Sequence, residues 1–211
     1  MLLCTLLRRL RAAAGFSAVE MVTVLSTVSV ITAVAAPSVD SYLDQARMAK
    51  ALSDEKVIAV ALVRLGVDVG VRERRARGWN DVGVLVSDGG IPQLAAGGDA
   101  RWTTPDTESL SAHLVSNEAQ YPAPSDGSWT GGWRGPYVDG VPGSDPWGRR
   151  YAVNAKWMVG SSALDTVVLS AGSDGRIATR FEQDGLVAGD DDVMTLVASG
   201  GELSPSTRKT P

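Results

Sequence analysis

Residues 15–37 read GFSAVEMVTVLSTVSVITAVAAP, and this stretch decides the architecture of the chain. Residues 16–36 hold one charged side chain, Glu20. Twenty-one helical residues span about 31 Å, which is roughly the thickness of the hydrocarbon core of a bilayer. The stretch therefore predicts a membrane-spanning helix. Three preceding arginines favour a cytoplasmic N-terminus, with the chain after Pro37 outside the cytoplasm: Arg8, Arg9 and Arg11.

The helix is expected to continue beyond the apolar stretch. Over residues 38–66 the apolar side chains recur mostly every three or four positions, which is typical of an amphipathic helix. Pro37 removes one hydrogen bond and should bend the helix rather than end it. We expect one long helix from about residue 16 to about residue 65, with polar side chains such as Asp54 on the face away from the apolar one.

The remaining chain predicts a small sheet. Residues 67–146 are rich in Gly, Pro, Asp and Trp and predict a variable, loop-rich region. This region holds a short helix over 107–115 and a basic cluster at 72–77, expected to be a solvated face or a helix end. Residues 149–155, 163–170 and 192–199 read as strands. The expected fold is therefore α+β: a long N-terminal helix packed on a small antiparallel sheet within 147–199, followed by a disordered tail over 200–211.

Charge and composition exclude several functions. The 211 residues include 20 basic and 24 acidic ones, so the net charge is −4, and loss of residues 1–15 would make it −7. An acidic product does not suit nucleic-acid binding. The one cysteine, Cys4, precedes Gly15, and the one histidine, His113, is expected at the surface or half-buried. No nucleophile elbow, P-loop or dinucleotide motif occurs, so we expect no enzyme activity.

The N-terminal motif resembles the prepilin processing site of type IV pilins and type II secretion pseudopilins. The match includes Gly15, Phe16, Glu20 and Pro37. The resemblance implies a pilin-like fold and a leader over 1–15 that a prepilin peptidase removes after Gly15. It also implies methylation of the new N-terminus at Phe16, and a segment 16–37 that serves first as membrane anchor and then as filament core.

Glu20 has a specific expected role. A carboxylate inside a membrane span costs about 2.5–3.5 kcal/mol, so it usually has a partner. We hypothesise that Glu20 pairs with the free amine of Phe16 on a neighbouring subunit and fixes the register of the filament.

Two simpler readings of the segment stay open. One is a secretory signal peptide cut at the A-x-A of residues 33–35, although the apolar run is long for that and Glu20 interrupts it. The other is a plain anchor, which leaves the spacing of Gly15, Phe16 and Glu20 and the position of Pro37 unexplained.

A second motif narrows the resemblance. Residues 133–151, WRGPYVDGVPGSDPWGRRY, resemble the major, G-type pseudopilin of type II secretion, through the Gly-Pro-Tyr of 135–137, Pro142, the Asp-Pro-Trp-Gly of 145–148 and Tyr151. Asp-Pro and Gly suit a tight turn, and the two rings at 147 and 151 are expected to pack in the core.

The same resemblance implies a calcium site in the last loop. Ca²⁺ takes six to eight oxygen ligands. The ligands carried over are Asp174, Asp190 and Asp192, with the backbone carbonyls of Leu169 and Ala171. Alternation along a strand would turn Asp191 away from Asp190 and Asp192, but Asp191 stays in the candidate metal set. The loop is longer than the family pattern, so Glu182 or Asp184 would substitute for one ligand. A solvated acidic turn is the alternative.

Together these features predict a structural pseudopilus subunit of a type II secretion system. It would sit in the inner membrane with its head in the periplasm and form a helical homopolymer. Its partners would be other pseudopilins, the prepilin peptidase and the inner-membrane assembly platform. A type IV pilin or minor pilin for adhesion, motility or uptake is the alternative. An anchored periplasmic binding protein, or a hydrolase using residues 190–192, is a third reading from another class.

Overall fold

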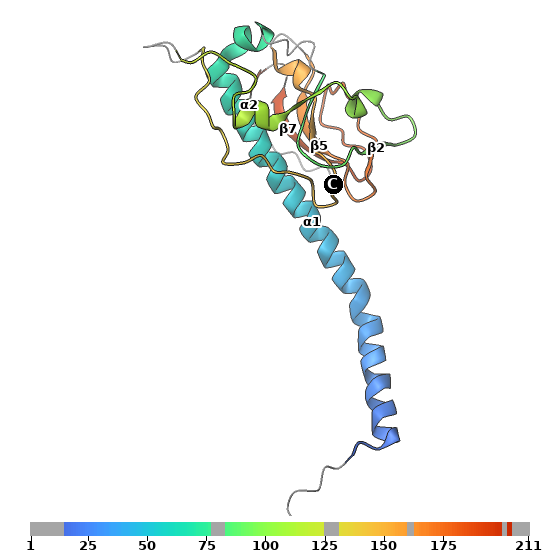
Figure 1. The fold of residues 1–211 in the computed structure, drawn as a ribbon. Helices are drawn as coiled ribbons and strands as arrows, with labels where there is room; N and C mark the ends of the chain where they lie inside the picture. The colour runs from blue at the N-terminus through green and yellow to red at the C-terminus, as the bar shows by residue number, and fades with distance from the viewer. Residues whose placement is uncertain (1–14, 77–82, 125–130, 160–162, 200–201, 204–211) are drawn as a thin grey trace, which may run out of the picture. The chain divides into compact units, whose positions relative to one another are not determined.

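The computed structural model describes residues 15–76, 83–124, 131–159, 163–199 and 202–203. The chain divides into two compact units, Met1–Leu43 and Asp44–Pro211. Helix α1, Ala18–Ala76, begins in the first unit and ends in the second (Figure 1). By length and composition, α1 contains one stretch that suits a membrane span, and none of its most apolar 18-residue window is buried.

The long helix is confirmed, and it extends further than predicted. The helix continues through Pro37. It is kinked at Gly70, whose backbone angles are not helical (φ 77°, ψ 164°). The extension past residue 65 buries Val69 and Arg74. The side chain of Arg74 is the one described within the basic cluster 72–77, and it is not solvated. Burial lowers the pKa of Arg74 to about 10, and its Nε donates to the Gly70 carbonyl at 3.2 Å.

The second unit contains a six-stranded sheet whose strands lie in the order β3-β1-β4-β5-β7-β8. These strands are β1 (Val84–Val86), β3 (Thr107–Ser109), β4 (Ala152–Val153), β5 (Thr166–Ser170), β7 (Val193–Ser199) and β8 (Glu202–Leu203). A separate parallel pair joins β2 (Gln93–Leu94) to β6 (Arg176–Ile177). Three short helices complete the described elements: η1 (Ala100–Thr103), α2 (Leu110–Leu114) and η2 (Ala155–Val159).

The predicted strands are confirmed, but the predicted antiparallel sheet is wrong. β4, β5 and β7 lie within the three predicted strand segments, and they pair antiparallel in that order. The whole sheet is mixed, because β3 runs parallel to β1. Both strands lie in the segment expected to be loop-rich, and each has three residues, too few to show a clear alternation of apolar and polar side chains.

Two further predictions hold only in part. The short helix expected over 107–115 is strand β3 followed by α2, which begins at Leu110. In the tail expected to be disordered, Glu202 and Leu203 pair with β7 as β8, and the rest of 200–211 lies outside the described residues. The leader predicted over 1–15 also lies outside them, except Gly15.

The sheet separates two apolar cores. On one face, α1 side chains such as Ile58 and Leu62 pack with Val168 of β5 and Val197 of β7. The amphipathic half of the helix therefore covers the sheet, as predicted. On the other face lie the alternate residues of the same strands: Val167, Leu169, Met194 and Leu196. Trp102 and Phe181 pack with them, and their ring centroids are 4.8 Å apart.

Candidate functional site

The start of α1 is a capping box. The Ser17 backbone N–H donates to Glu20 Oε2 at 2.8 Å, and the Glu20 N–H donates to Ser17 Oγ at 3.2 Å. This reciprocal pair satisfies two of the donors that a helix leaves open at its first turn. The Glu20 carboxylate is thereby held towards the N-terminal end of the helix. Gly15 and Phe16 precede the helix and are exposed, so the bond predicted to be cut lies in accessible chain.

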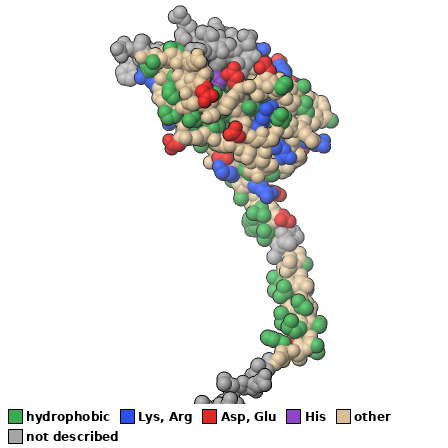
Figure 2. All heavy atoms as spheres, in the orientation of Figure 1, with side chains coloured by type: hydrophobic (Ala, Val, Ile, Leu, Met, Phe, Trp, Pro, Cys, Tyr) green, Lys and Arg blue, Asp and Glu red, His purple; other side chains and the backbone are tan. Residues whose placement is uncertain are grey.

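Every residue from 15 to 34 is exposed, and the space-filling view shows apolar side chains along the visible face of the first half of α1 (Figure 2). Phe16, just before the helix, and nine large apolar residues within this half of it are at least 48% exposed: Val19, Met21, Val22, Val24, Leu25, Val28, Val30, Ile31 and Val34. A helix that is apolar on all sides needs an apolar environment around it.

The hydroxyl groups of the same segment are satisfied within the helix. Thr23 Oγ1 donates to the Val19 carbonyl at 2.8 Å, and Ser29 Oγ donates to the Leu25 carbonyl at 2.7 Å. Ser26, Thr27 and Thr32 donate to carbonyls one turn earlier in the same way. Because these hydroxyl groups are hydrogen-bonded within the helix, they need no water, and the segment suits a lipid or protein environment. Glu20 is then its strongly polar side chain.

In the last loop, Asp192 is buried immediately before β7. Its Oδ2 accepts hydrogen bonds from the Ala178 N–H at 2.9 Å, the Thr179 N–H at 2.7 Å and Thr179 Oγ1 at 2.6 Å. Its Oδ1 is buried and has no partner among the described residues. Burial raises the pKa of Asp192, against the effect of the Thr179 and Ala178 donors, and the charge of Asp174 adds to the rise.

The other predicted ligands are exposed acids. Asp174 Oδ1 accepts from the Arg176 N–H at 2.7 Å, and Asp191 Oδ2 accepts from Ser173 Oγ at 2.6 Å. The Asp191 backbone also lies against Gly172, where an added Cβ would be 1.8 Å from the Asp191 carbonyl oxygen. The two ends of the loop therefore lie side by side, and Gly172 (φ +60°) permits this close approach.

These residues do not form a group of three side-chain ligands. Within the described residues, no cluster of three or more His, Cys, Asp or Glu is placed to hold a metal ion. Asp190 is exposed, Leu169 lies inside β5 between β4 and β7, and Ala171 is buried just after that strand. The feature that suits a cation is the open, buried Oδ1 of Asp192.

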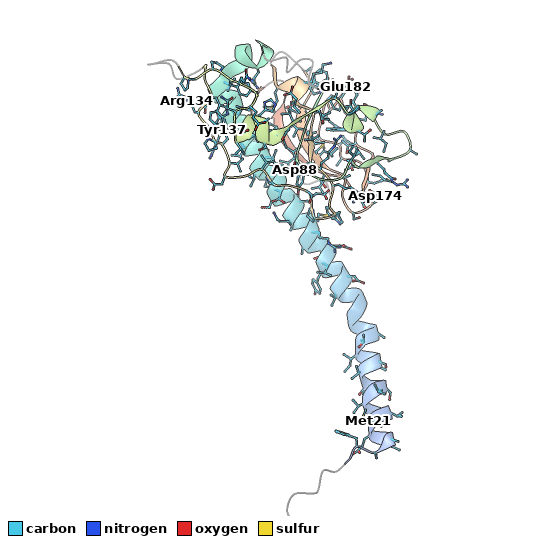
Figure 3. The ribbon with its side chains drawn as sticks, in the orientation of Figure 1. Met21, Asp88, Arg134, Tyr137, Asp174 and Glu182 are labelled. Carbon is cyan, nitrogen blue, oxygen red and sulfur yellow. The ribbon has the colours of Figure 1, made fainter. Side chains whose placement is uncertain are left out.

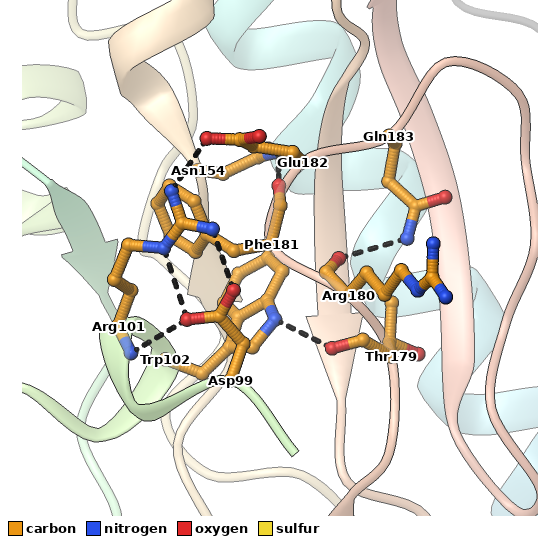
Figure 4. Close-up of polar contacts among 9 residues, drawn as sticks. All are labelled: Asp99, Arg101, Trp102, Asn154, Thr179, Arg180, Phe181, Glu182 and Gln183. Carbon is orange, nitrogen blue, oxygen red and sulfur yellow. Dashed lines mark hydrogen bonds and ion pairs between the residues drawn. The ribbon is translucent and has the colours of Figure 1, made fainter. Parts of the chain in front are cut away.

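Glu182, a reserve ligand, has a different partner (Figure 4). Its Oε1 is 2.7 Å from Nη1 of Arg101, whose Nε and Nη2 reach the two carboxylate oxygens of Asp99 at 2.9 and 2.6 Å. The guanidinium also lies 4.7 Å from the centre of the Phe181 ring. Asp184, the other reserve ligand, is exposed.

The Asp-Pro-Trp-Gly stretch forms the predicted turn, and Tyr151 packs in the core as expected, whereas Trp147 is half-buried and belongs to neither core. The contacts of Asp145 were not predicted. Asp145 is buried, and its Oδ1 accepts from the backbone N–H of Trp147 at 3.0 Å and of Arg149 at 2.8 Å. Its Oδ2 accepts from Ser170 Oγ at 2.7 Å. Asp145 therefore closes the turn and ties it to β5.

Two carboxylates of α1 join the helix to the sheet. Asp54, expected on the solvent face, is buried and accepts from the Tyr151 hydroxyl at 3.2 Å. Glu55 is fully buried, its Oε2 accepts from Thr195 Oγ1 at 2.8 Å, and burial holds its pKa well above the usual value. The charges of Asp145 and Asp192 add to that rise.

His113 is also buried, contrary to expectation. Its Nδ1 is 2.7 Å from the Tyr121 hydroxyl and its Nε2 is 2.8 Å from Glu108 Oε2. Burial lowers the pKa of His113, and the Glu108 carboxylate opposes that change. The histidine links α2 to the following loop.

No known family, curated protein or solved structure matches this chain.

Proposed function

We propose that this chain is a structural subunit of the pseudopilus of a type II protein secretion system, assembled through its N-terminal helix. The observation that carries the proposal is the first half of α1. It is apolar and exposed on all sides, it contains one carboxylate, and it follows an accessible Gly15–Phe16 bond.

The exposed apolar surface favours insertion and assembly. Burying one large apolar side chain contributes about 1.5–3 kcal/mol, so ten of them represent on the order of 15–30 kcal/mol. That free energy is recovered first in the lipid of the inner membrane and then among the helices of a filament. The head, from Asp44 onward, would lie in the periplasm.

The capping box holds the Glu20 carboxylate close to the proposed new N-terminus at Phe16. Cleavage after Gly15 would create an ammonium group on Phe16, next to Ser17, whose N–H already binds the Glu20 carboxylate. Within a filament, the carboxylate of one subunit would pair with the ammonium group of the next. Two opposite charges in an apolar surround are costly to separate, so this pair would select one axial register.

The resemblance of residues 133–151 to the G-type pseudopilin supports secretion rather than a type IV pilus. The structure gives that stretch a structural role, since Asp145 and Tyr151 join the turn to the sheet and to α1. The proposed partners are further copies, other pseudopilins, the prepilin peptidase and the inner-membrane assembly platform.

A calcium ion is part of the proposal, and the residues fit it in part. Asp192 would supply its open Oδ1, with Asp174, Asp190 or Asp191 and the carbonyls of Leu169 or Ala171 completing the oxygen set. Calcium would supply positive charge that joins the two ends of the loop and offsets the repulsion among its carboxylates.

The assembly role of Glu20 can be separated from its capping role. Glu20→Gln keeps a capping side chain but removes the charge, whereas Ser17→Ala removes the Ser17 hydroxyl from the cap and keeps the charge. We expect Glu20→Gln to abolish sedimentable filaments and Ser17→Ala to retain them. Normal assembly of Glu20→Gln would refute the proposed pairing.

A further inference from the structure

An open groove lined by both apolar and basic side chains lies along α1 in the second unit. Its volume is about 380 Å³, and it is lined by Val63, Arg64, Val67, Arg134, Pro136 and Tyr137. Val67 is 55% exposed. One carboxylate, Asp68, also lines the groove, and it hydrogen-bonds the Tyr137 side chain.

The groove is held in shape by contacts between the loop and the helix. The N–H groups of Gly131 and Gly132 donate to the Asp68 carbonyl at 2.8 and 3.1 Å. The Tyr137 hydroxyl accepts from the Arg134 N–H at 3.0 Å, and the Trp133 ring meets the Tyr137 ring edge-on. A preformed groove loses little conformational entropy when it is filled.

The acidic loop, residues 182–191, has the complementary character. It contains four carboxylates and no basic residue. At its tip, Val187 is 67% exposed, whereas its neighbours Leu186 and Ala188 pack against the core. Asp184 and Asp190 are exposed on either side of Val187.

This loop is also held in shape. The buried Gln183 side chain accepts from the Val187 N–H at 3.3 Å and donates to the Val187 carbonyl at 3.4 Å and to the Arg180 carbonyl at 2.8 Å. The exposed valine is therefore presented on a fixed turn.

The groove and the acidic loop lie on opposite faces of the sheet. Tyr137 packs with the core on the α1 face, and Leu186 packs with the core on the other face. The side-chain view shows Arg134 and Tyr137 on one side of this unit and Glu182 on the other (Figure 3). The two surfaces of one chain therefore do not meet each other.

We propose that the acidic loop of one copy docks into the groove of the next copy, with Val187 against Val67, and Asp184 and Asp190 facing Arg64 and Arg134. This inference rests on the proposed filament and adds a head-to-head contact to it. Because the two surfaces differ, the contact is heterologous and repeats from copy to copy, as an open helical polymer requires. Opposite charges at the rim select the partner and the register.

Cysteine cross-linking in cells that express the full chain tests this contact. Cys4 is the only cysteine, so Cys4→Ser gives a background without thiols. Val67→Cys chains co-expressed with Val187→Cys chains should give disulfide dimers on mild oxidation, and a chain with both changes should give a ladder of multimers. Either single variant alone should stay monomeric.

A matched control uses Val57→Cys, an exposed valine on the same helix. It lies ten residues from Val67, about 15 Å along the axis, whereas a disulfide needs Cα atoms within about 7 Å. Val57→Cys should therefore not link to Val187→Cys. Arg64→Glu should lower the Val67–Val187 yield by about two- to fivefold, and Asp184→Lys in the partner should restore it.

The outcomes distinguish this contact from the proposed function. Sedimentable filaments without a Val67–Val187 dimer would overturn the contact and leave the pseudopilin proposal standing. Dimers of Val67→Cys with a different protein alone would assign the groove to that protein and also overturn the contact. Absence of both filaments and dimers would remove both proposals.

Discussion

Replacement of Asp145 by alanine should destabilise the head more than replacement of any exposed acid nearby. Asp145→Ala leaves the backbone N–H groups of Trp147 and Arg149 without their acceptor and frees Ser170 Oγ from its partner. Each donor left unsatisfied costs about 1–3 kcal/mol when it is buried. Two such groups give a range of about 2–6 kcal/mol in the free energy of unfolding, and because both hydrogen bonds are part-buried we expect a loss in the lower half of that range.

One effect opposes this loss. The charge of Asp145 helps to raise the pKa of the buried Glu55, so its removal relieves a repulsion. Asp145→Asn should fall between wild type and Asp145→Ala, because its side-chain oxygen still accepts from both N–H groups.

The assay is guanidinium unfolding of the full chain in detergent, followed by tryptophan fluorescence. Asp139→Ala is the matched control, since Asp139 is exposed and lies in the same segment. Its unfolding free energy should stay within about 0.5 kcal/mol of wild type. If Asp145→Ala changed stability no more than Asp139→Ala, the role assigned to Asp145 in closing the turn would be wrong.

Three further substitutions test other parts of the account. Burial raises the folded pKa of Glu55, so the contribution of Glu55 to stability is greatest below the unfolded pKa of 4.5 and is lost as the pH rises towards the folded pKa. Glu55→Gln should therefore be more stable than wild type at pH 7.5 but not at pH 4. Equal unfolding curves for the two proteins at pH 7.5 would contradict this. Trp102→Ala should lower the free energy of unfolding by about 3–5 kcal/mol, because it removes a fully buried ring and its Nε1 hydrogen bond to the Thr179 carbonyl. A loss below about 1 kcal/mol would show that the core on the face of the sheet away from α1 does not depend on Trp102. Calcium should raise the melting temperature of wild type, with reversal by EDTA, but not that of Asp192→Asn; no calcium effect on wild type would remove the calcium site from the proposal.

Much of the fold follows from local patterns in the sequence. The first half of α1 could be predicted because 21 residues with one charge leave few alternatives to an apolar helix. β5 and β7 were predictable because each is an apolar run bounded by Gly and Asp. β1 and β3 were missed because three residues carry no usable period, and their parallel pairing depends on contacts rather than on composition.

The polar contacts within the head could not be predicted in the same way. Asp54 was expected to face solvent, and its pairing with Lys50 one turn earlier fits that, yet it also accepts from Tyr151, 97 positions away. Glu55 accepts from Thr195, 140 positions away. For the candidate metal site, the sequence placed the proposed ligands in and around the loop before β7 and included Asp192 among them, and that assignment stays a prediction. The sequence did not show that the Oδ2 of Asp192 would be taken by residues 178 and 179, which leaves one oxygen open.

The most direct test of the central claim is the chemical identity of the mature N-terminus, determined by mass spectrometry or N-terminal sequencing of the membrane-extracted protein. We expect a chain that begins with N-methylated Phe16 and retains the whole of α1. A chain that begins at Ala36, after the A-x-A sequence, would show that the apolar segment is a signal peptide, and it would contradict the filament account.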